Sequence, residues 1–214
     1  KAEQIIYPAS ITKVLSVLTA LQYAKMSDTV VFSEDSISFL QWDDAQIGMK
    51  PGEEISMESA LYGMLLASAN EVSYAVAENV GKQYLNGGYA EFIEEMNRIS
   101  QELGCTSSNW VNANGLHDDN HYTTAHDMAR IAAAAYQNEE FRRLETTLEY
   151  KVPPTNLTAE ERILDQNHKM LWPENYYYYA NAKAGKTGYT DQSKTTLVTM
   201  AEGNDMQLAA VVLH

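Results

Sequence analysis

A serine and a lysine lie three positions apart near the start of the chain, in the segment Tyr7-Pro8-Ala9-Ser10-Ile11-Thr12-Lys13. On a helix, residues with this spacing share a face, so the side chains of Ser10 and Lys13 are expected to meet. A serine hydroxyl is a poor nucleophile at neutral pH, so it needs a base within hydrogen-bond reach. Lys13 is the only candidate base that the local spacing guarantees. Apolar residues follow directly, which predicts a buried helix whose burial and dipole lower the pKa of that lysine. Alone, the pair is weak evidence for a nucleophilic site, because the same spacing occurs by chance in many helices.

Two further motifs follow in an order that strengthens the first. Ser68-Ala69-Asn70 lies between two apolar helical runs, and a break there lets both polar side chains project into a cleft. A simple N-cap role would explain Asn70 without any catalytic function. Lys186-Thr187-Gly188 precedes a strand-like segment near the end of the chain, and it supplies a positive charge and a hydroxyl. Each triplet is weak by itself, whereas the ordered set of three is strong.

Hydrophobic patterning predicts the elements that position these motifs. The chain has 214 residues and 45% hydrophobic content, enough for one sizeable core, so we expect a single catalytic unit over residues 1–214. The predicted helices cover about residues 9–24, 56–67, 70–80, 89–103, 124–135 and 141–144, and the predicted strands cover 28–33, 150–152, 195–201 and 206–213. Residues 36–49 and 109–123 have no clear period and are expected to be irregular connections.

The ordered motifs Ser-x-x-Lys, Ser-x-Asn and Lys-Thr-Gly are similar to the motif set of penicillin-binding proteins and serine β-lactamases. The chain resembles in particular the low-molecular-mass D-alanyl-D-alanine carboxypeptidases, through residues 7–10, 115–124 and 186–190, and the likeness covers essentially its whole length. The resemblance implies an α+β fold in which an antiparallel sheet flanked by helices adjoins an all-helical lobe. Because the chain begins almost on its nucleophile and ends in an apolar strand, we expect strands and helices of this fold to be missing at both ends.

The resemblance also implies a reaction, acyl transfer through a covalent serine ester. In that reaction Ser10 attacks and Lys13 takes its proton. Ser68 relays a proton to the leaving amine, and Asn70 contacts the substrate amide and orients the lysine. These four residues are the predicted catalytic set.

Residues of the third motif are the predicted substrate-binding set. Lys186 and Thr187 would bind the terminal carboxylate of a peptide, and Gly188 would let the substrate backbone pair with the strand edge. By the same resemblance, the oxyanion hole uses the backbone N–H groups of Ser10 and Tyr189. The sequence departs from the family pattern soon afterwards, because residues 193–194 are Ser-Lys where a small residue and glycine are usual. The strand geometry at that point is therefore less certain.

The implied substrate is the D-Ala-D-Ala end of a peptidoglycan stem peptide, which loses its last D-alanine, and the implied inhibitors are β-lactam antibiotics. No cofactor is implied. The resemblance places the protein outside the cytoplasm, in the cell envelope, with its export signal and any membrane anchor in segments that this chain lacks. A formal net charge of −14 argues against nucleic acid or an anionic membrane surface as a direct partner.

Two other features have plain structural interpretations. Cys105 is the single cysteine, so no internal disulfide forms, and it is expected to be a buried small apolar residue. His117 and His121 are four positions apart, but the Gly, Asn and Asp residues around them oppose a helix that would bring them together, so no metal site is predicted. The run Tyr176–Tyr179 is explained equally well by a cleft lining and by alternating burial.

Three other functions share part of this pattern. A β-lactamase needs a base for hydrolysis of the acyl-enzyme, and Glu161-Arg162-Ile163-Leu164-Asp165 approaches the usual Glu-x-x-Leu-Asn, but it lies too close to the third motif. A D,D-endopeptidase would use the same catalytic residues and differ in cleft shape. A β-lactam sensor or cell-wall binding module would keep the acyl-enzyme without hydrolysing it.

Overall fold

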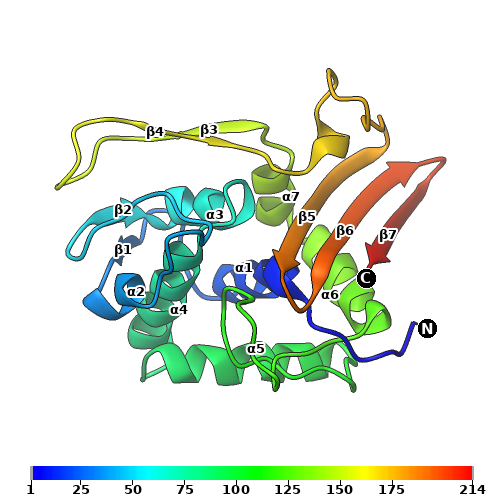
Figure 1. Ribbon diagram of the computed structural model, residues 1–214, viewed down its shortest axis with the longest axis horizontal. Helices are drawn as coiled ribbons and strands as arrows, with labels where there is room; N and C mark the ends of the chain where they lie inside the picture. The colour runs from blue at the N-terminus through cyan, green and yellow to red at the C-terminus, as the bar shows by residue number, and fades with distance from the viewer. Residues whose placement is uncertain (1, 214) are drawn as a thin grey trace.

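The computed structural model describes residues 2–213 and shows a sheet packed on helices beside a mainly helical lobe (Figure 1). The elements in chain order are η1 (Ala9–Thr12), α1 (Lys13–Leu21), β1 (Thr29–Val31), α2 (Glu34–Ser38), β2 (Glu54–Ser56), α3 (Met57–Leu65), α4 (Asn70–Tyr84), α5 (Tyr89–Glu102), α6 (Ala125–Gln137), α7 (Glu139–Glu145), β3 (Glu149–Val152), β4 (Arg162–Asp165), η2 (Lys169–Leu171), β5 (Ala182–Thr190), β6 (Lys194–Gly203) and β7 (Met206–Val212). The α+β class predicted from the sequence is confirmed.

Helix α1 lies at the centre of the molecule, surrounded by α3, α4, α5, α6 and α7, all of which it contacts (Figure 1). Nearly all of its residues are buried, as the apolar run predicts. The predicted helix over residues 9–24 is shorter and begins differently, with the 3-10 turn η1. Ala9 has a left-handed φ of 53°, which an α-helix cannot contain, so the regular helix starts only at Lys13.

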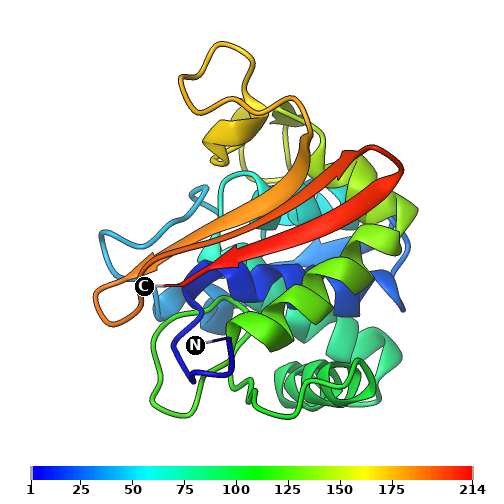
Figure 2. The same cartoon turned by 90° about the vertical axis from the view of Figure 1, so that its right-hand side faces the viewer.

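The larger sheet has the order β5-β6-β7 with antiparallel pairing throughout. It covers η1 and α6, as the side view in Figure 2 shows. The predicted hairpin of β6 and β7 is confirmed, and its turn places Asn204 and Asp205 at positive φ, which these residue types tolerate well. The third motif lies inside strand β5, whereas the sequence analysis placed it before a strand.

The helical lobe is built from α2 to α5, and its boundaries follow local signals. Ser56 caps α3 by accepting a hydrogen bond from Ser59 N, and α5 is followed by Gly104 at a φ of 79°. Gly81 lets α4 meet the turn before α5, because a Cβ atom there would lie 1.8 Å from Gly88 O. None of the helices in residues 2–213 is long and apolar enough to cross a membrane.

The sequence analysis missed four short elements, α2, β2, β4 and η2, and the longer strand β5. Strand β2 pairs with β1, and β4 pairs with β3 in the hairpin drawn along the top of Figure 1. The lobe therefore carries two small sheets and is not all-helical, which corrects the expectation. Strands β2 and β4 have only three and four residues, so pairing with a partner determines them more than their own pattern does.

Two side-chain predictions can be compared directly with the structure. Cys105 is buried, and burial raises the pKa of its thiol to about 11, so it is an inert core residue as expected. The alternating burial considered for Tyr176–Tyr179 is wrong, because all four side chains are exposed, from 44% for Tyr178 to 94% for Tyr176. They also lie outside the residues that line the cleft beside Ser10.

Candidate active site

Ser10 and Lys13 meet as their spacing predicts, with 3.0 Å between Ser10 Oγ and Lys13 Nζ. Lys13 is fully buried, and its Nζ also lies 2.8 Å from Asn70 Oδ1 and 2.6 Å from the carbonyl oxygen of Asn114. Burial, followed by the nearby positive charge of Lys186, holds the pKa of Lys13 well below its ordinary value. A lowered pKa suits the amine to accept a proton from Ser10.

Ser68 lies in the break between α3 and α4, in a left-handed conformation with a φ of 61°. Such a conformation costs a residue with a side chain on the order of 1–3 kcal/mol and is concentrated at functional sites. It aims Ser68 Oγ at Lys186 Nζ, 3.0 Å away. Asn70 is the first residue of α4 and not its N-cap, and its side chain is used to hold Lys13.

Lys186 joins the second motif to the third from its position in β5. Its side chain is buried, and Nζ donates to Ser68 Oγ and to the carbonyl oxygen of Thr187, each at 3.0 Å. Burial lowers the pKa of Lys186 to about 8, while the carboxylate of Glu145 acts in the opposite direction. Thr187 is half-buried beside it.

Gly188 is where β5 passes the nucleophile most closely. A Cβ atom on Gly188 would lie 2.4 Å from Thr196 Oγ1 and 2.8 Å from the backbone nitrogen of Ser10, so only glycine fits. Thr196 in turn donates to the carbonyl oxygen of Pro8 at 2.8 Å, which ties η1 to β6. The sheet thereby fixes the position of the Ser10 backbone N–H.

A cleft of about 440 Å³ opens beside Ser10. Its lining comes from five segments: Ser10; Asp43, Asp44 and Ala45; Asn70; Gly115, Leu116 and His117; and Tyr189, Thr190, Asp191 and Gln192. Among the predicted site residues, Ser10, Asn70 and Tyr189 face this space. Lys13 is buried and reaches the cleft through its contacts with Ser10 and Asn70. Ser68 and Lys186 are buried and bonded to each other, and neither they nor Thr187 and Gly188 are among the residues that line the cleft.

The loop 112–117 supplies site residues that the sequence analysis did not assign. The carbonyl oxygen of Asn114 is the third group in contact with Lys13 Nζ. Gly115 has a φ of 87°, and a Cβ atom there would lie 2.0 Å from Ala9 O, so glycine lets the loop close on η1. Gly115 begins the segment 115–124 that carries the family resemblance, but Asn114 lies just before it. The contact of Asn114 uses a backbone carbonyl, which leaves no mark on residue type.

Two buried acids, Glu71 and Glu145, were also missed. Glu71 accepts a hydrogen bond from Ile47 N at 2.7 Å, and burial raises the pKa of its carboxyl while the charge of Lys13 opposes that rise. Glu145, at the end of α7, is fully buried near Lys186. Nothing in their sequence surroundings separates them from the many exposed glutamates of an acidic chain.

His121 is buried and contacts Thr12, which lies between Ser10 and Lys13. One ring nitrogen lies 2.8 Å from Thr12 Oγ1, the other accepts from Val111 N at 3.1 Å, and burial lowers its pKa to about 3. Within residues 2–213 no group of three or more His, Cys, Asp or Glu side chains could hold a metal ion. Glu161, the base considered for a β-lactamase, is exposed and does not line the cleft.

Comparison with known proteins gives relatives of one kind. The chain is 31% identical to D-alanyl-D-alanine carboxypeptidase DacF of Bacillus subtilis, over 96% of this chain and 50% of that protein. It is 29% identical to DacB2 of Mycobacterium tuberculosis, over 97% of this chain and 66% of that protein. The chain thus spans about half to two thirds of the length of these curated relatives.

Solved structures agree in fold. A D-alanyl-D-alanine carboxypeptidase from Mycobacterium tuberculosis superposes with a TM-score of 0.87 and 27% identity, over 100% of this chain and 75% of that one. The DD-transpeptidase of Streptomyces K15 has a TM-score of 0.88 at 22% identity, over 99% and 82% of the two chains, and shows the fold alone. The family described as D-alanyl-D-alanine carboxypeptidase matches all of residues 1–214. This match, which includes all three motifs around Ser10, shows that the chain belongs to peptidase family S11, the D-alanyl-D-alanine carboxypeptidases.

Proposed function

We propose that this chain is the catalytic unit of a serine-type D-alanyl-D-alanine carboxypeptidase. Its substrate is a peptidoglycan stem peptide ending in D-Ala-D-Ala, and its products are the shortened peptide and D-alanine. The observation that carries the proposal is the contact of Ser10 Oγ with a fully buried lysine amine of lowered pKa, at the edge of an open cleft. Because peptidoglycan is built outside the cytoplasmic membrane, the site of action is outside the cytoplasm.

Acylation is the first half of the reaction. Ser10 Oγ attacks the carbonyl carbon between the two D-alanines, and neutral Lys13 accepts the hydroxyl proton. The backbone N–H groups of Ser10 and Tyr189 stabilise the oxyanion, an assignment supported by the close approach of β5 to Ser10 at Gly188. The C–N bond then breaks and leaves an ester on Ser10.

The leaving D-alanine needs a proton as its C–N bond breaks. We assign this role to Ser68, whose hydroxyl accepts a hydrogen bond from Lys186 Nζ at 3.0 Å and can donate its own proton to the amine. The proton that Lys13 took from Ser10 then replaces the one that Ser68 gave to the amine, so both side chains return to their starting protonation and the step balances. Water then hydrolyses the ester and regenerates Ser10.

The terminal carboxylate of the peptide is bound by the third motif. Lys186 and the hydroxyl of Thr187 provide a cation and a donor in a chain whose formal net charge is −14. Because an acidic protein repels an anionic peptide end at long range, a local cation is needed to hold it. Gly188, on the free edge of β5, leaves room for the peptide backbone.

The test is release of D-alanine from a synthetic peptide ending in D-Ala-D-Ala, measured beside labelling with a fluorescent penicillin. We expect both in the wild-type protein and neither in Ser10→Ala, while Ser38→Ala, which removes an exposed hydroxyl from α2, behaves as wild type. Stoichiometric labelling of Ser10→Ala would contradict the assignment of the nucleophile. Labelling without D-alanine release would instead favour a β-lactam sensor, and preferred cleavage of a cross-linked peptide would favour an endopeptidase.

A further inference from the structure

Residues 43–47, which we call the wall segment, belong to the connection between α2 and β2, and the first three of them line the cleft beside Ser10. None of residues 37–48 is buried, so side-chain packing gives this part of the chain little support. A segment with few buried contacts keeps its position mainly through hydrogen bonds. The groups that make those bonds therefore decide the shape of the cleft on this side.

Glu71, the second residue of α4, makes one of those bonds. Its side chain is fully buried, and its Oε1 accepts from the backbone nitrogen of Ile47 at 2.7 Å. The backbone nitrogen of Asn70 donates to the carbonyl oxygen of Ala45 at 2.8 Å. Two consecutive residues at the start of α4 thus hold two alternate residues of the wall segment.

The same helix start also holds the proposed base. Asn70 Oδ1 lies 2.8 Å from Lys13 Nζ, so Asn70 bonds the base through its side chain and the wall segment through its backbone. Glu71 adds a second bond to the wall segment without touching the base. Residues 70 and 71 together therefore set where the wall of the cleft lies relative to the reacting groups.

The direction of a bound peptide indicates which part of it meets the wall segment, a step that rests on the proposed function. The oxyanion is assigned to the N–H groups of Ser10 and Tyr189, and the terminal carboxylate to Lys186, which precedes Tyr189 on β5. A peptide therefore runs antiparallel to β5, and the part before its D-Ala-D-Ala end extends past Tyr189 toward residues 190–192. Those residues line the cleft together with the wall segment, so this part of the peptide lies between them.

We propose that Glu71 is a positioning residue that fixes the wall segment, and through it the binding of the peptide residues that precede D-Ala-D-Ala. Glu71 is buried and is not among the residues that line the cleft, so it acts only through the segment that it holds. Its role needs an acceptor oxygen for Ile47 N and does not need a charge. Burial raises the pKa of its carboxyl, but a carboxyl oxygen accepts this hydrogen bond in either protonation state.

Two substitutions separate the acceptor from the charge. Glu71→Gln keeps an oxygen for Ile47 N, whereas Glu71→Met has a similar length and removes both acceptor and charge; Glu71→Ala takes its place if the methionine variant does not fold. We expect hydrogen exchange of the Ile47 amide to be faster by about tenfold or more in Glu71→Met and nearly unchanged in Glu71→Gln. Amides inside α4 should keep their wild-type rates, which shows that the helix remains folded.

Substrates of two lengths test the consequence for binding. For a peptide with several residues before D-Ala-D-Ala, we expect Glu71→Met to raise KM about tenfold and to change kcat by less than about twofold. For an N-acetylated D-Ala-D-Ala dipeptide, which lacks those residues, KM should stay near the wild-type value. Glu71→Gln should match wild type with both substrates. A merely structural role would lower the melting temperature and impair both substrates alike.

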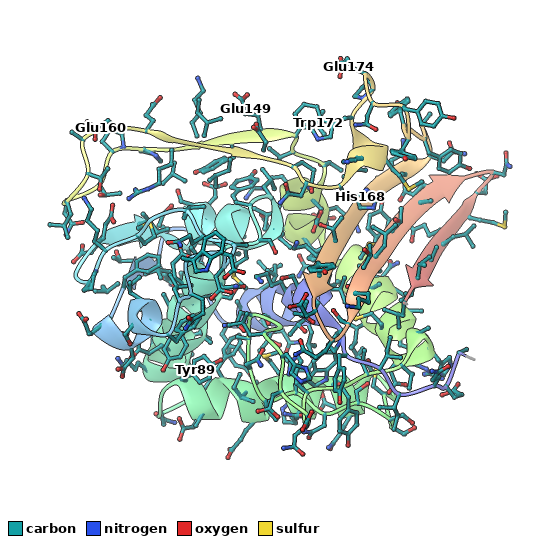
Figure 3. All side chains as sticks on the ribbon, in the orientation of Figure 1. Tyr89, Glu149, Glu160, His168, Trp172 and Glu174 are labelled. Atoms are coloured by element: carbon teal, nitrogen blue, oxygen red, sulfur yellow. The ribbon has the colours of Figure 1, made fainter. Side chains whose placement is uncertain are left out.

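Two variants serve as controls. Asn79 lies further along α4, where its side chain bonds Val31 N at 3.2 Å and Val31 O at 2.8 Å, so Asn79→Ala removes comparable bonds to another segment. It should lower the melting temperature without changing KM. Glu149→Ala removes a negative charge from the exposed face of β3 (Figure 3) and should change neither quantity.

The proposal and the proposed function fail in different ways. Equal losses of the long and short substrates in Glu71→Met, an unchanged KM for both, or an impairment of Glu71→Gln as large as that of Glu71→Met would overturn the positioning role. If the wild-type protein releases no D-alanine, the carboxypeptidase assignment fails, whereas exchange of the Ile47 amide still decides whether Glu71 holds the wall segment.

Discussion

Replacing Gly188 by alanine is a sharp test of how the sheet positions the nucleophile. The added Cβ would lie 2.4 Å from Thr196 Oγ1 and 2.8 Å from Ser10 N, whereas ordinary contact needs about 3.5 Å. Thr196 cannot simply rotate away, because it is buried and bonded to Pro8 O. Strand β5 must therefore retreat from η1 by roughly 1 Å, since overlaps of this size are not absorbed by flexible groups.

Such a movement has two measurable costs. Overpacking of this kind destabilises a protein by about 1–3 kcal/mol, and a misplacement of about 1 Å at a reacting group can cost about 10²-fold in rate. We therefore expect Gly188→Ala to melt at a lower temperature and to acylate with fluorescent penicillin on the order of 100-fold more slowly. Stopped-flow acylation and thermal unfolding by circular dichroism measure the two effects separately.

Gly203→Ala is the control, because the three atoms nearest to a Cβ there belong to the exposed side chain of Asn181, with Nδ2 at 2.9 Å. It should change the melting temperature slightly and leave acylation unchanged. If Gly188→Ala acylates at the wild-type rate, then the contact between β5 and η1 does not set the position of Ser10, and the proposed oxyanion hole loses its support.

Three other outcomes are expected. Acylation by penicillin should rise with pH and level off well below the ordinary lysine pKa of about 10.4, because Lys13 must be neutral to act as base; a flat rate, or normal acylation by Lys13→Ala, would refute this role. Lys186→Gln should cost about 2–4 kcal/mol in kcat/KM for acid-ended peptides and much less for amidated ones, so equal losses would move the carboxylate anchor elsewhere. Burial raises the pKa of Glu53, but hydrogen bonds from Thr155 and Arg162 outweigh burial and lower the pKa overall. The stability that the ionised carboxylate contributes is therefore present above the ordinary glutamate pKa of about 4.3 and is lost as pH falls through the depressed pKa. When the melting temperature is measured against pH, it should fall more steeply in acid for wild type than for Glu53→Gln.

The sequence was most informative where one short segment carries both partners. Ser10 and Lys13 meet because three positions separate them, and the hairpin of β6 and β7 follows from its turn residues. These are local relations that residue type and spacing determine. The sequence shows the order of the three motifs but not which of their residues are in contact, because the contact between Ser68 and Lys186 spans 118 positions of the chain.

The features that were missed depend on contacts made elsewhere. The carbonyl of Asn114 leaves no trace in residue type, and Glu145 looks like any other glutamate until α7 packs against β5. Strands β2 and β4 have three and four residues, which is too short for a period to be recognised. The start of α1 was misplaced because the left-handed turn at Ala9 is imposed by the surrounding contacts and is unusual for alanine.

The central claim is that Ser10 forms the covalent intermediate on a substrate ending in D-Ala-D-Ala. The most direct measurement lets the protein react with an ester analogue of such a peptide that gives a slowly hydrolysed acyl-enzyme. The reaction is then quenched, the protein is digested, and the adduct is located by tandem mass spectrometry. The account predicts a single acyl group, on the peptide that contains Ser10, which is absent from Ser10→Ala and reduced in Lys13→Ala. An acyl group on another residue, or cleavage of the ester analogue without any adduct at Ser10, would contradict it.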